Sequence, residues 1–235
     1  MNLILLFPED YIEANRVRLT GRRHRHIFSI LGAKIGDELS VGLLNDKIGI
    51  GRIILIDAAS LDMEVELKGV PPMPLPMTLI LALPRPQALK RTLICASTLG
   101  IKRIVILNCH RVEKSLCQST TLHESSIRDH LILGLEQAKD TILPDVTLRK
   151  LFKIFVEDEL PDLIKGTIPF VAHPGALHSC PVSVRQPVTF FIGPEGGFID
   201  YEVDKLKRLG FTDVDLGERI LKVESVLPYV AGKMF

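Results

Sequence analysis

The sequence contains no tryptophan and few aromatic residues, and it lacks long hydrophobic runs. Its four cysteines form no CxxC pair and have no zinc-ligand spacing, so we expect reduced, mostly buried thiols and no metal site (Cys95, Cys109, Cys117 and Cys180). No apolar run approaches the roughly 18 to 20 residues of a membrane helix. The opening stretch MNLILLFPEDY is too short for a signal peptide. We therefore expect a soluble, cytoplasmic protein.

The remaining composition is that of a folded protein with more than one domain. The chain has 235 residues, of which 46% are hydrophobic and 24% are charged. This balance permits a proper core and excludes a disordered chain. The length suits one small domain followed by one of medium size.

The net charge of +1 hides an uneven distribution of basic residues. The stretch RVRLTGRRHRH, residues 16–26, holds five arginines and two histidines without an acid. Residues 70–115 hold seven Lys and Arg against a single acid, Glu113. Basic patches on a nearly neutral protein favour local binding of a phosphate backbone. For the second patch alone, ordinary solvated surface is the better interpretation.

Residues 1–70 are predicted to form a small β-barrel. Their pattern indicates short strands and one short helix over residues 24–31 that Gly32 ends (strands 3–7, 38–44, 48–57 and 61–68). The following PPMPLPM, residues 71–77, has four prolines, which predicts a stiff linker and a domain boundary.

From residue 78 to 235 strands alternate with helices, which predicts a parallel sheet covered on both faces. The expected strands cover residues 78–83, 104–107, 168–172, 188–192 and 214–216. The expected helices cover residues 87–99, 127–139, 201–209 and 223–235, with Asp200 as the N-cap of the third.

Ligands of open α/β sheets bind beyond the carboxyl ends of the strands, where three loops qualify. They are His173–Gly175, Gly193–Gly197 and Gly217–Arg219. In the middle loop, GPEGG, adjacent glycines allow close approach of a ligand or a positive φ. It is neither a Walker loop nor GxGxxG, so a dinucleotide is disfavoured. On these residues alone, a tight turn is at least as good an interpretation as a cofactor loop.

Two motifs near the C-terminus carry a family resemblance. FFIGPEGGF (residues 190–198), followed by LGERILKVES (residues 216–225), resembles the RsmE family of 16S ribosomal RNA uracil-N3 methyltransferases in the SPOUT superfamily. The resemblance extends over essentially the whole chain, with further similar blocks at residues 23–41, 96–115 and 134–144.

The resemblance implies an N-terminal PUA-like β-barrel and a C-terminal SPOUT α/β domain with a trefoil knot. It also implies methylation of uracil N3 in 16S rRNA of the small ribosomal subunit, with S-adenosylmethionine (SAM) as methyl donor and no metal. The protein would be a homodimer with active sites at the subunit interface. Contacts to SAM are expected from Ala172, His173, Gly193, Glu195, Gly196, Gly197, Leu216, Gly217, Ile220 and Leu221.

The chain departs from the family pattern at a few positions. Lys222 and Val223 replace an arginine and a threonine of the family. Thr98-Leu99-Gly100 stands where the family commonly has Glu-Leu-Gly, and Asp140 stands where an arginine often follows the EQ block. Lys222 keeps the charge but loses the planar fork of a guanidinium. Two alternatives remain: a SPOUT methyltransferase for another RNA position, such as a ribose 2′-hydroxyl, or a catalytically silent rRNA-binding assembly factor.

Methylation of uracil N3 requires an extruded base, because N3 lies on the Watson–Crick edge, and it requires loss of the N3 proton. Glu195 and Glu224 are the candidate general bases, with a structural role equally open for each. Arg219 is expected to bind substrate RNA or the SAM carboxylate, with a structural salt bridge as the alternative. RNA phosphates are expected to bind Arg16, Arg18, Arg22, Arg23, Arg25 and Lys222.

Overall fold

A computed structural model describes all residues, 1–235, and the chain forms two compact units. The N-terminal unit comprises Met1–Met73 and Ile132–Leu143, and the C-terminal unit comprises Pro74–Leu131 and Pro144–Phe235. The boundary predicted from the proline-rich stretch 71–77 stays a prediction. Nothing in the sequence pattern indicated that residues 132–143 would belong to the first unit.

The N-terminal unit is built on a six-stranded sheet in the order β1-β4-β5-β6-β3-β2. Strand β1 pairs with β4 in parallel and all other pairs are antiparallel. The two edge strands do not pair with each other, so the sheet is a curled half-barrel. Its strands are β1 (Ile4–Leu6), β2 (Tyr11–Glu13), β3 (Arg16–Leu19), β4 (Glu38–Leu43), β5 (Ile48–Ile56) and β6 (Leu61–Gly69).

Helical segments fill the open side of this half-barrel. Helix α1 (Gly21–Arg25) continues into the π-helical turn η2 (His26–Leu31), and the short η1 (Pro8–Asp10) precedes β2. Ile27 of η2 is fully buried in the core with Leu19, Val41 and Met63. Gly32 ends the segment with φ near +61°, which confirms the predicted stop signal.

The C-terminal unit has a parallel sheet of seven strands in the order β11-β13-β10-β12-β7-β8-β9. The predicted strands 168–172 and 188–192 have the same bounds in the structure. The strands over residues 145–149 and 178–179 and the helical segment over residues 152–163 were not predicted. The strands are β7 (Met77–Ala82), β8 (Arg103–Leu107), β9 (Asp145–Arg149), β10 (Ile168–Ala172), β11 (His178–Ser179), β12 (Val188–Ile192) and β13 (Thr212–Asp215).

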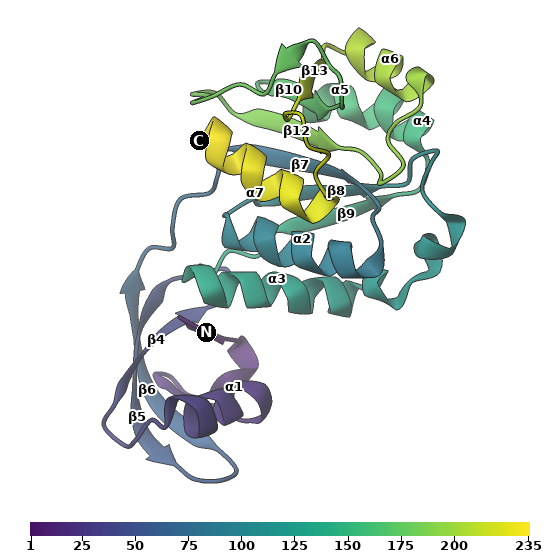
Figure 1. Ribbon diagram of the computed structural model, residues 1–235. Coiled ribbons are helices and arrows are strands. Elements are labelled where there is room, and N and C mark those ends of the chain that lie inside the picture. Colours follow the sequence, from purple (N-terminus) through teal and green to yellow (C-terminus); the bar gives the residue numbers. More distant parts are fainter. The chain divides into compact units, whose positions relative to one another are not determined.

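Helices cover this sheet, and α2 and α7 lie side by side against it (Figure 1). The Lys205–Glu157 ion pair joins α6 to η5, in the helical segment from α4 to α5. Asp200, predicted as an N-cap, is instead the first residue of α6, and Ile199 is the N-cap. The helices are α2 (Pro86–Thr98), α3 (Glu124–Ala138), α4 (Phe152–Ile154), η5 (Phe155–Glu159), α5 (Leu160–Leu163), α6 (Asp200–Arg208) and α7 (Val223–Met234), with short turns η3 (Lys114–Gln118) and η4 (Thr120–Leu122).

The strand order brings the three predicted loops together. Strands β13, β10 and β12 are neighbours, and the loops that follow them leave from the same edge of the parallel sheet. The loops after β7 and β8 leave from this edge too, beside the loop after β12. These connections form the candidate active site.

Of the cysteines, Cys109 and Cys180 are buried, whereas Cys117 is exposed.

Candidate active site

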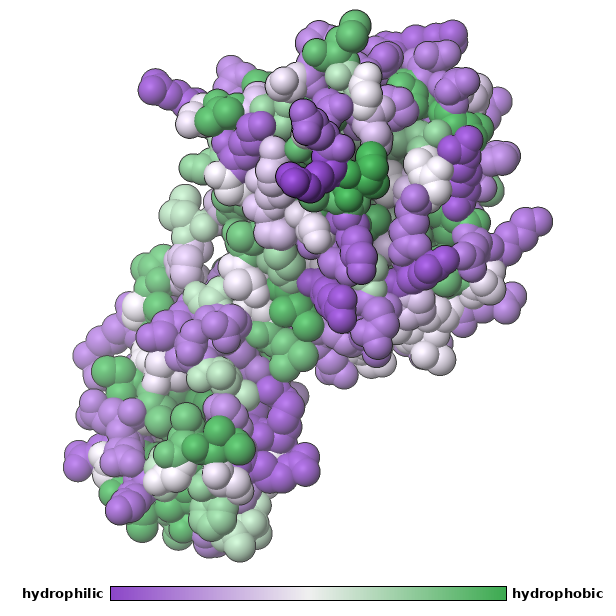
Figure 2. Space-filling view, viewed as in Figure 1, coloured by the Kyte–Doolittle hydropathy of each residue, from purple (hydrophilic) through white to green (hydrophobic).

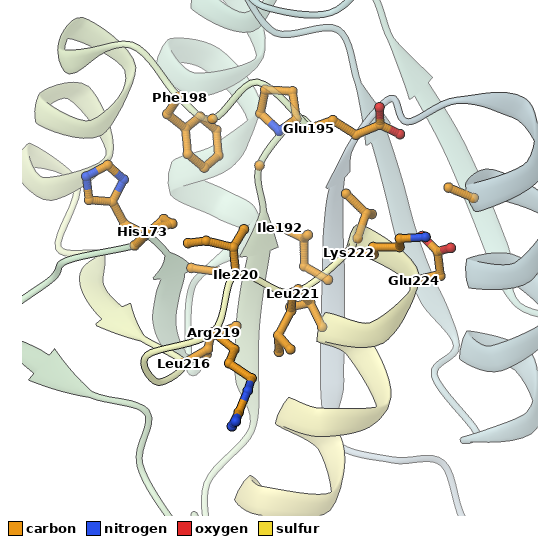
Figure 3. Close-up of a pocket in the computed structure, with 18 of the residues that line it drawn as sticks. His173, Ile192, Glu195, Phe198, Leu216, Arg219, Ile220, Leu221, Lys222 and Glu224 are labelled. Atoms are coloured by element: carbon orange, nitrogen blue, oxygen red, sulfur yellow. The ribbon is translucent and has the colours of Figure 1, made fainter.

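The main cavity of the C-terminal unit lies where the loops after β10, β12 and β13 meet the start of α7 (Figure 3). Its volume is about 530 Å³, which falls within the roughly 300–1,000 Å³ of small-ligand pockets. All residues predicted to contact a cofactor line it, except Gly196. The cavity also receives Arg85, Gln87 and Ala88 from the start of α2, which were not predicted.

Glycines let the backbone form the wall of the main cavity. A Cβ atom on Gly193 would lie 2.7 Å from the ring of Phe198, which itself packs edge-on against Phe191. Gly197 has φ near +74° and donates its N–H to the carbonyl of Pro194, at 2.8 Å. Gly217 has φ near +114°. The left-handed conformation therefore falls on Gly197 and Gly217, and Gly196 does not require it.

The carboxylate of Asp215 ties two of the cavity loops together. It accepts hydrogen bonds from the backbone N–H of Gly217, at 2.6 Å, and of Gly175, at 3.0 Å. These two bonds hold the pKa of Asp215 below its ordinary value. Sequence reasoning missed this residue, although an aspartate two residues before a glycine at a strand end is a typical turn signal.

The segment after β8 supports the Gly193–Gly197 loop from behind. Arg111 donates from Nη1 to the carbonyl oxygen of Gly196, at 2.8 Å. Buried Glu202 of α6 accepts the backbone N–H of His110, at 2.8 Å, and of Ile199, at 3.1 Å. Burial, together with the charge of Glu202, raises the pKa of the Cys109 thiol. Neither Arg111 nor Glu202 was a candidate from sequence, because their partners are distant along the chain.

The predicted catalytic carboxylates both pair with arginines. Oε2 of Glu195 lies 3.2 Å from Nε of Arg85, whose Nη2 lies 3.4 Å from Oε1 of Glu113. Oε1 of Glu224, in the first turn of α7, lies 3.3 Å from Nη1 of Arg91. The two acids thus stand on the side of the cavity that α2 forms.

The predicted basic residues of the main cavity are exposed and separate from these pairs. Arg219 lies in the loop after β13 and points away from Glu195 (Figure 3). Lys222 is the exposed residue that precedes α7. The structure therefore brings Arg219, Glu195, Glu224 and Lys222 to one cavity, but it does not join Arg219 to either carboxylate.

Four of the five arginines in the N-terminal run pair with acids of their own unit. Arg16 and Arg18 both bind the Asp62 carboxylate, at 2.8 and 2.7 Å. Arg22 makes two bonds to Glu136, at 2.8 and 2.9 Å. The side chains of Asp62 and Glu136 are 0% and 2% exposed. These arginines therefore neutralise buried carboxylates, as well as presenting charge at the surface.

Arg23 and Arg25 illustrate the two extremes of the run. Arg23 is 14% exposed and binds Asp10 through both Nη atoms, at 2.6 and 2.7 Å. Its guanidinium also lies over the ring of Phe7, 4.7 Å from the centroid. Arg25 is exposed, and its side chain makes no ion pair or hydrogen bond in the structure. Whether the five arginines bind RNA stays a prediction.

Comparison with known proteins agrees with this architecture. Residues 71–234 match the family described as RNA methyltransferase domain. Ribosomal RNA small subunit methyltransferase E of Treponema pallidum is 29% identical over 236 residues, 96% of this chain and 87% of that protein. Ribosomal RNA small subunit methyltransferase E 1 of Borreliella burgdorferi is 22% identical over 225 residues, 96% of this chain and 93% of that protein.

A solved structure has the same fold. It is a ribosomal RNA small subunit methyltransferase E from Neisseria gonorrhoeae, bound to S-adenosyl methionine. It superposes with a TM-score of 0.73 at 18% identity, over 98% of this chain and 95% of that one. At this identity the likeness shows the fold alone. It confirms the predicted fold class, a PUA-like N-terminal barrel followed by a SPOUT α/β domain.

Proposed function

This chain belongs to the RNA methyltransferase family, and on that premise we propose that it methylates N3 of a uracil in 16S rRNA with SAM as methyl donor. The observation that supports the proposal best is the main cavity, whose walls come from the GPEGG and LGERIL loops that carried the family resemblance. The names of the relatives supply the small-subunit rRNA as substrate.

The residues of the main cavity fit SAM. A side chain on Gly193 would collide with the ring of Phe198, and one on Gly197 or Gly217 would strain the backbone, so glycine keeps the loops in this shape. Apolar side chains of Ile192 and Leu221 suit a flat ring (Figure 3). We propose that the three loops hold SAM, with Ala172, His173, Glu195, Gly196, Leu216 and Ile220 among the contacts.

SAM supplies a methyl group on a positively charged sulfur, which a nitrogen lone pair can attack. The new bond joins the methyl carbon to N3, the carbon–sulfur bond breaks, and the N3 proton passes to a base. The protein contributes by holding the extruded uracil with N3 in line with the methyl group.

We assign the proton transfer to Glu195, since it lies in the GPEGG loop and lines the main cavity. Glu224 then has the positioning role, since it lies in the first turn of α7 and pairs with Arg91. Arg219 and Lys222 are exposed at the same cavity, where they would bind RNA phosphates or the SAM carboxylate.

The N-terminal unit would bind the rRNA through its exposed basic side chains. Arg25 is the strongest candidate because no acid of the protein neutralises it. Arg18 and Arg22 are half exposed, so their outward N–H groups could bind phosphates while they hold Asp62 and Glu136. Arg16 and Arg23 are less exposed and would contribute less.

A second copy of the chain would complete the site. Ile220 lies at the main cavity and is 78% exposed, and Tyr229 and Phe235 of the closing segment are also exposed. Hydrophobic surface is visible over the loop that leads into α7, among hydrophilic residues (Figure 2). Burial of such side chains in a homodimer would place two active sites at one interface.

A cytoplasmic location follows from a ribosomal substrate. No helix in the structure combines the length and apolarity that crossing a membrane requires.

Nucleoside analysis tests the proposed reaction. The purified protein and SAM are incubated with small ribosomal subunits from a strain without the homologous enzyme, and the rRNA is digested and analysed by mass spectrometry. We expect N3-methyluridine. A ribose-methylated product would show that the enzyme methylates another RNA position. SAM binding without any methylated product would indicate a catalytically silent assembly factor.

A further inference from the structure

A second cavity adjoins the Gly193–Gly197 loop and is lined by the loops after β7, β8 and β12. Its volume is about 330 Å³, at the lower end of the roughly 300–1,000 Å³ of small-ligand sites. It shares Arg85, Pro194 and Glu195 with the main cavity. The two cavities are therefore neighbours with a common border at the GPEGG loop.

We propose that this second cavity receives the target nucleotide, which rests on the function proposed above. Its lining is mixed. Leu83, Val112 and Leu116 suit the faces of a flat pyrimidine, beside two arginines and two glutamates. Guanidinium groups of Arg85 and Arg111 at the cavity suit the phosphates on either side of that base.

The charges at the border fit a base that must lose a proton. Glu195 lines both cavities, so its carboxylate can face N3 of a uracil in one and the methyl donor in the other. Arg85 lies between Glu195 and Glu113, with contacts of 3.2 and 3.4 Å, and its side chain is 65% exposed. These contacts are long and exposed, so an RNA phosphate can compete for the guanidinium.

Arg111 links the nucleotide site to the cofactor loop. It lines the second cavity and donates to the carbonyl of Gly196, at 2.8 Å. A Cβ atom on Gly196 would lie 3.4 Å from Cβ of Arg111, so the side chain packs directly on the loop. The sites for SAM and for the target nucleotide thus meet at Arg85, Pro194 and Glu195, which line both cavities.

Filling the second cavity tests the proposal. Leu116, half-buried in η3, is replaced by Trp, and kcat/KM for small-subunit rRNA and the Kd for SAM are measured. We expect kcat/KM to fall about 10²-fold, since a misplaced base is not in line for transfer, while the Kd for SAM is unchanged. Val182→Trp is the control, because Val182 is exposed near the end of α7 and lines neither cavity.

Two results with Leu116→Trp would overturn the proposal. One is normal methyl transfer to rRNA. The other is loss of SAM binding, which would make the second cavity part of the cofactor site.

A binding measurement keeps the proposal separate from the proposed function. The chain has no tryptophan, so Ser115→Trp places a single indole in η3 beside the second cavity. We expect saturable quenching of its fluorescence by uridine 5′-monophosphate, and none in Ile154→Trp. Quenching in a protein that transfers no methyl group would contradict the proposed function and leave the nucleotide site standing. Absence of quenching would contradict the proposed nucleotide site, whether or not Leu116→Trp folds.

Discussion

The two units use arginine in different ways. In the N-terminal unit, Arg16, Arg18 and Arg23 bind carboxylates that are almost completely buried. In the C-terminal unit, Arg85 makes longer contacts to exposed acids at the cavities, and Arg219 is exposed without an ion pair. Arginine density in the sequence is greatest in the first unit, but much of that charge is neutralised internally.

The difference shows that a run of basic residues does not measure the charge available to a ligand. The acids that neutralise the run, Asp10, Asp62 and Glu136, lie outside it in sequence. Since a buried carboxylate is costly without a partner, those arginines are needed for the fold whatever else they bind. We therefore expect changes in the first unit to affect stability and changes at the cavities to affect binding and catalysis.

The largest effect is expected from Asp62→Ala. It removes the three short hydrogen bonds that Arg16 and Arg18 make to a fully buried carboxylate, which should lower the free energy of unfolding by about 3 kcal/mol. Urea denaturation measures this loss, and calorimetry should show unchanged SAM affinity in the folded protein. Unchanged stability would mean that Asp62 is not a structural partner of the arginines.

The next effect concerns the glycines of the cofactor loops. Gly217→Val places a β-branched residue at φ near +114°, which should cost about 1–3 kcal/mol locally and weaken SAM binding about 10- to 100-fold. Gly210→Val is the matched control, because Gly210 also has a positive φ, near +93°, but lines neither cavity. Calorimetry with equal SAM affinity in both variants would place the cofactor elsewhere.

A smaller effect is expected for rRNA binding by the N-terminal unit. Arg25→Ala should leave stability unchanged and reduce the slope of log K against log salt by about 0.7 to 0.9, for one lost phosphate contact. Arg23→Ala should instead lower stability, because Asp10 loses its partner. An unchanged salt slope for Arg25→Ala would remove this residue from the RNA-binding surface.

The smallest effect is a pH dependence that distinguishes two aspartates. The pKa of Asp62 is lowered chiefly by its bond to Arg18, and that of Asp215 by backbone N–H groups. Both contributions are complete above the ordinary aspartate pKa of 3.8 and are lost as pH falls through the lower folded value. Acid titration of stability should therefore flatten in Asp62→Asn. An identical acid transition in wild type and variant would contradict the Asp62 assignment.

Local signals predicted much of the fold. The buried runs at 168–172 and 188–192 became strands with the predicted bounds, because five residues flanked by Gly and Pro loops are too short for a helix and favour a strand. The short strands β2 and β3 were not predicted. Strand β3 alternates Arg16, Val17, Arg18 and Leu19, and its arginines were interpreted as part of a phosphate-binding patch. A strand whose arginines bind a buried acid cannot be distinguished locally from a solvated basic stretch.

The candidate site was predictable where it depends on backbone and motif. The three loops were identified from glycines at strand ends, and the sheet order brings them together. The roles of Arg111 and Glu202 were not predictable, because each acts on a segment about 85 or more residues away. Gly197 has a positive φ and Gly196 does not, because the N–H of Gly197 closes a turn with the carbonyl of Pro194. The sequence does not show which of the two adjacent glycines closes this turn.

Crosslinking is the most direct test of the claim that the target nucleotide meets the protein at the C-terminal cavities. Small-subunit rRNA that contains 4-thiouridine is irradiated in complex with the protein and SAM analogue, and crosslinked peptides are identified by mass spectrometry. We predict crosslinks at residues 83–85, 111–113, 116 and 194–196, which line the second cavity. Crosslinks confined to residues 1–73 would contradict the account.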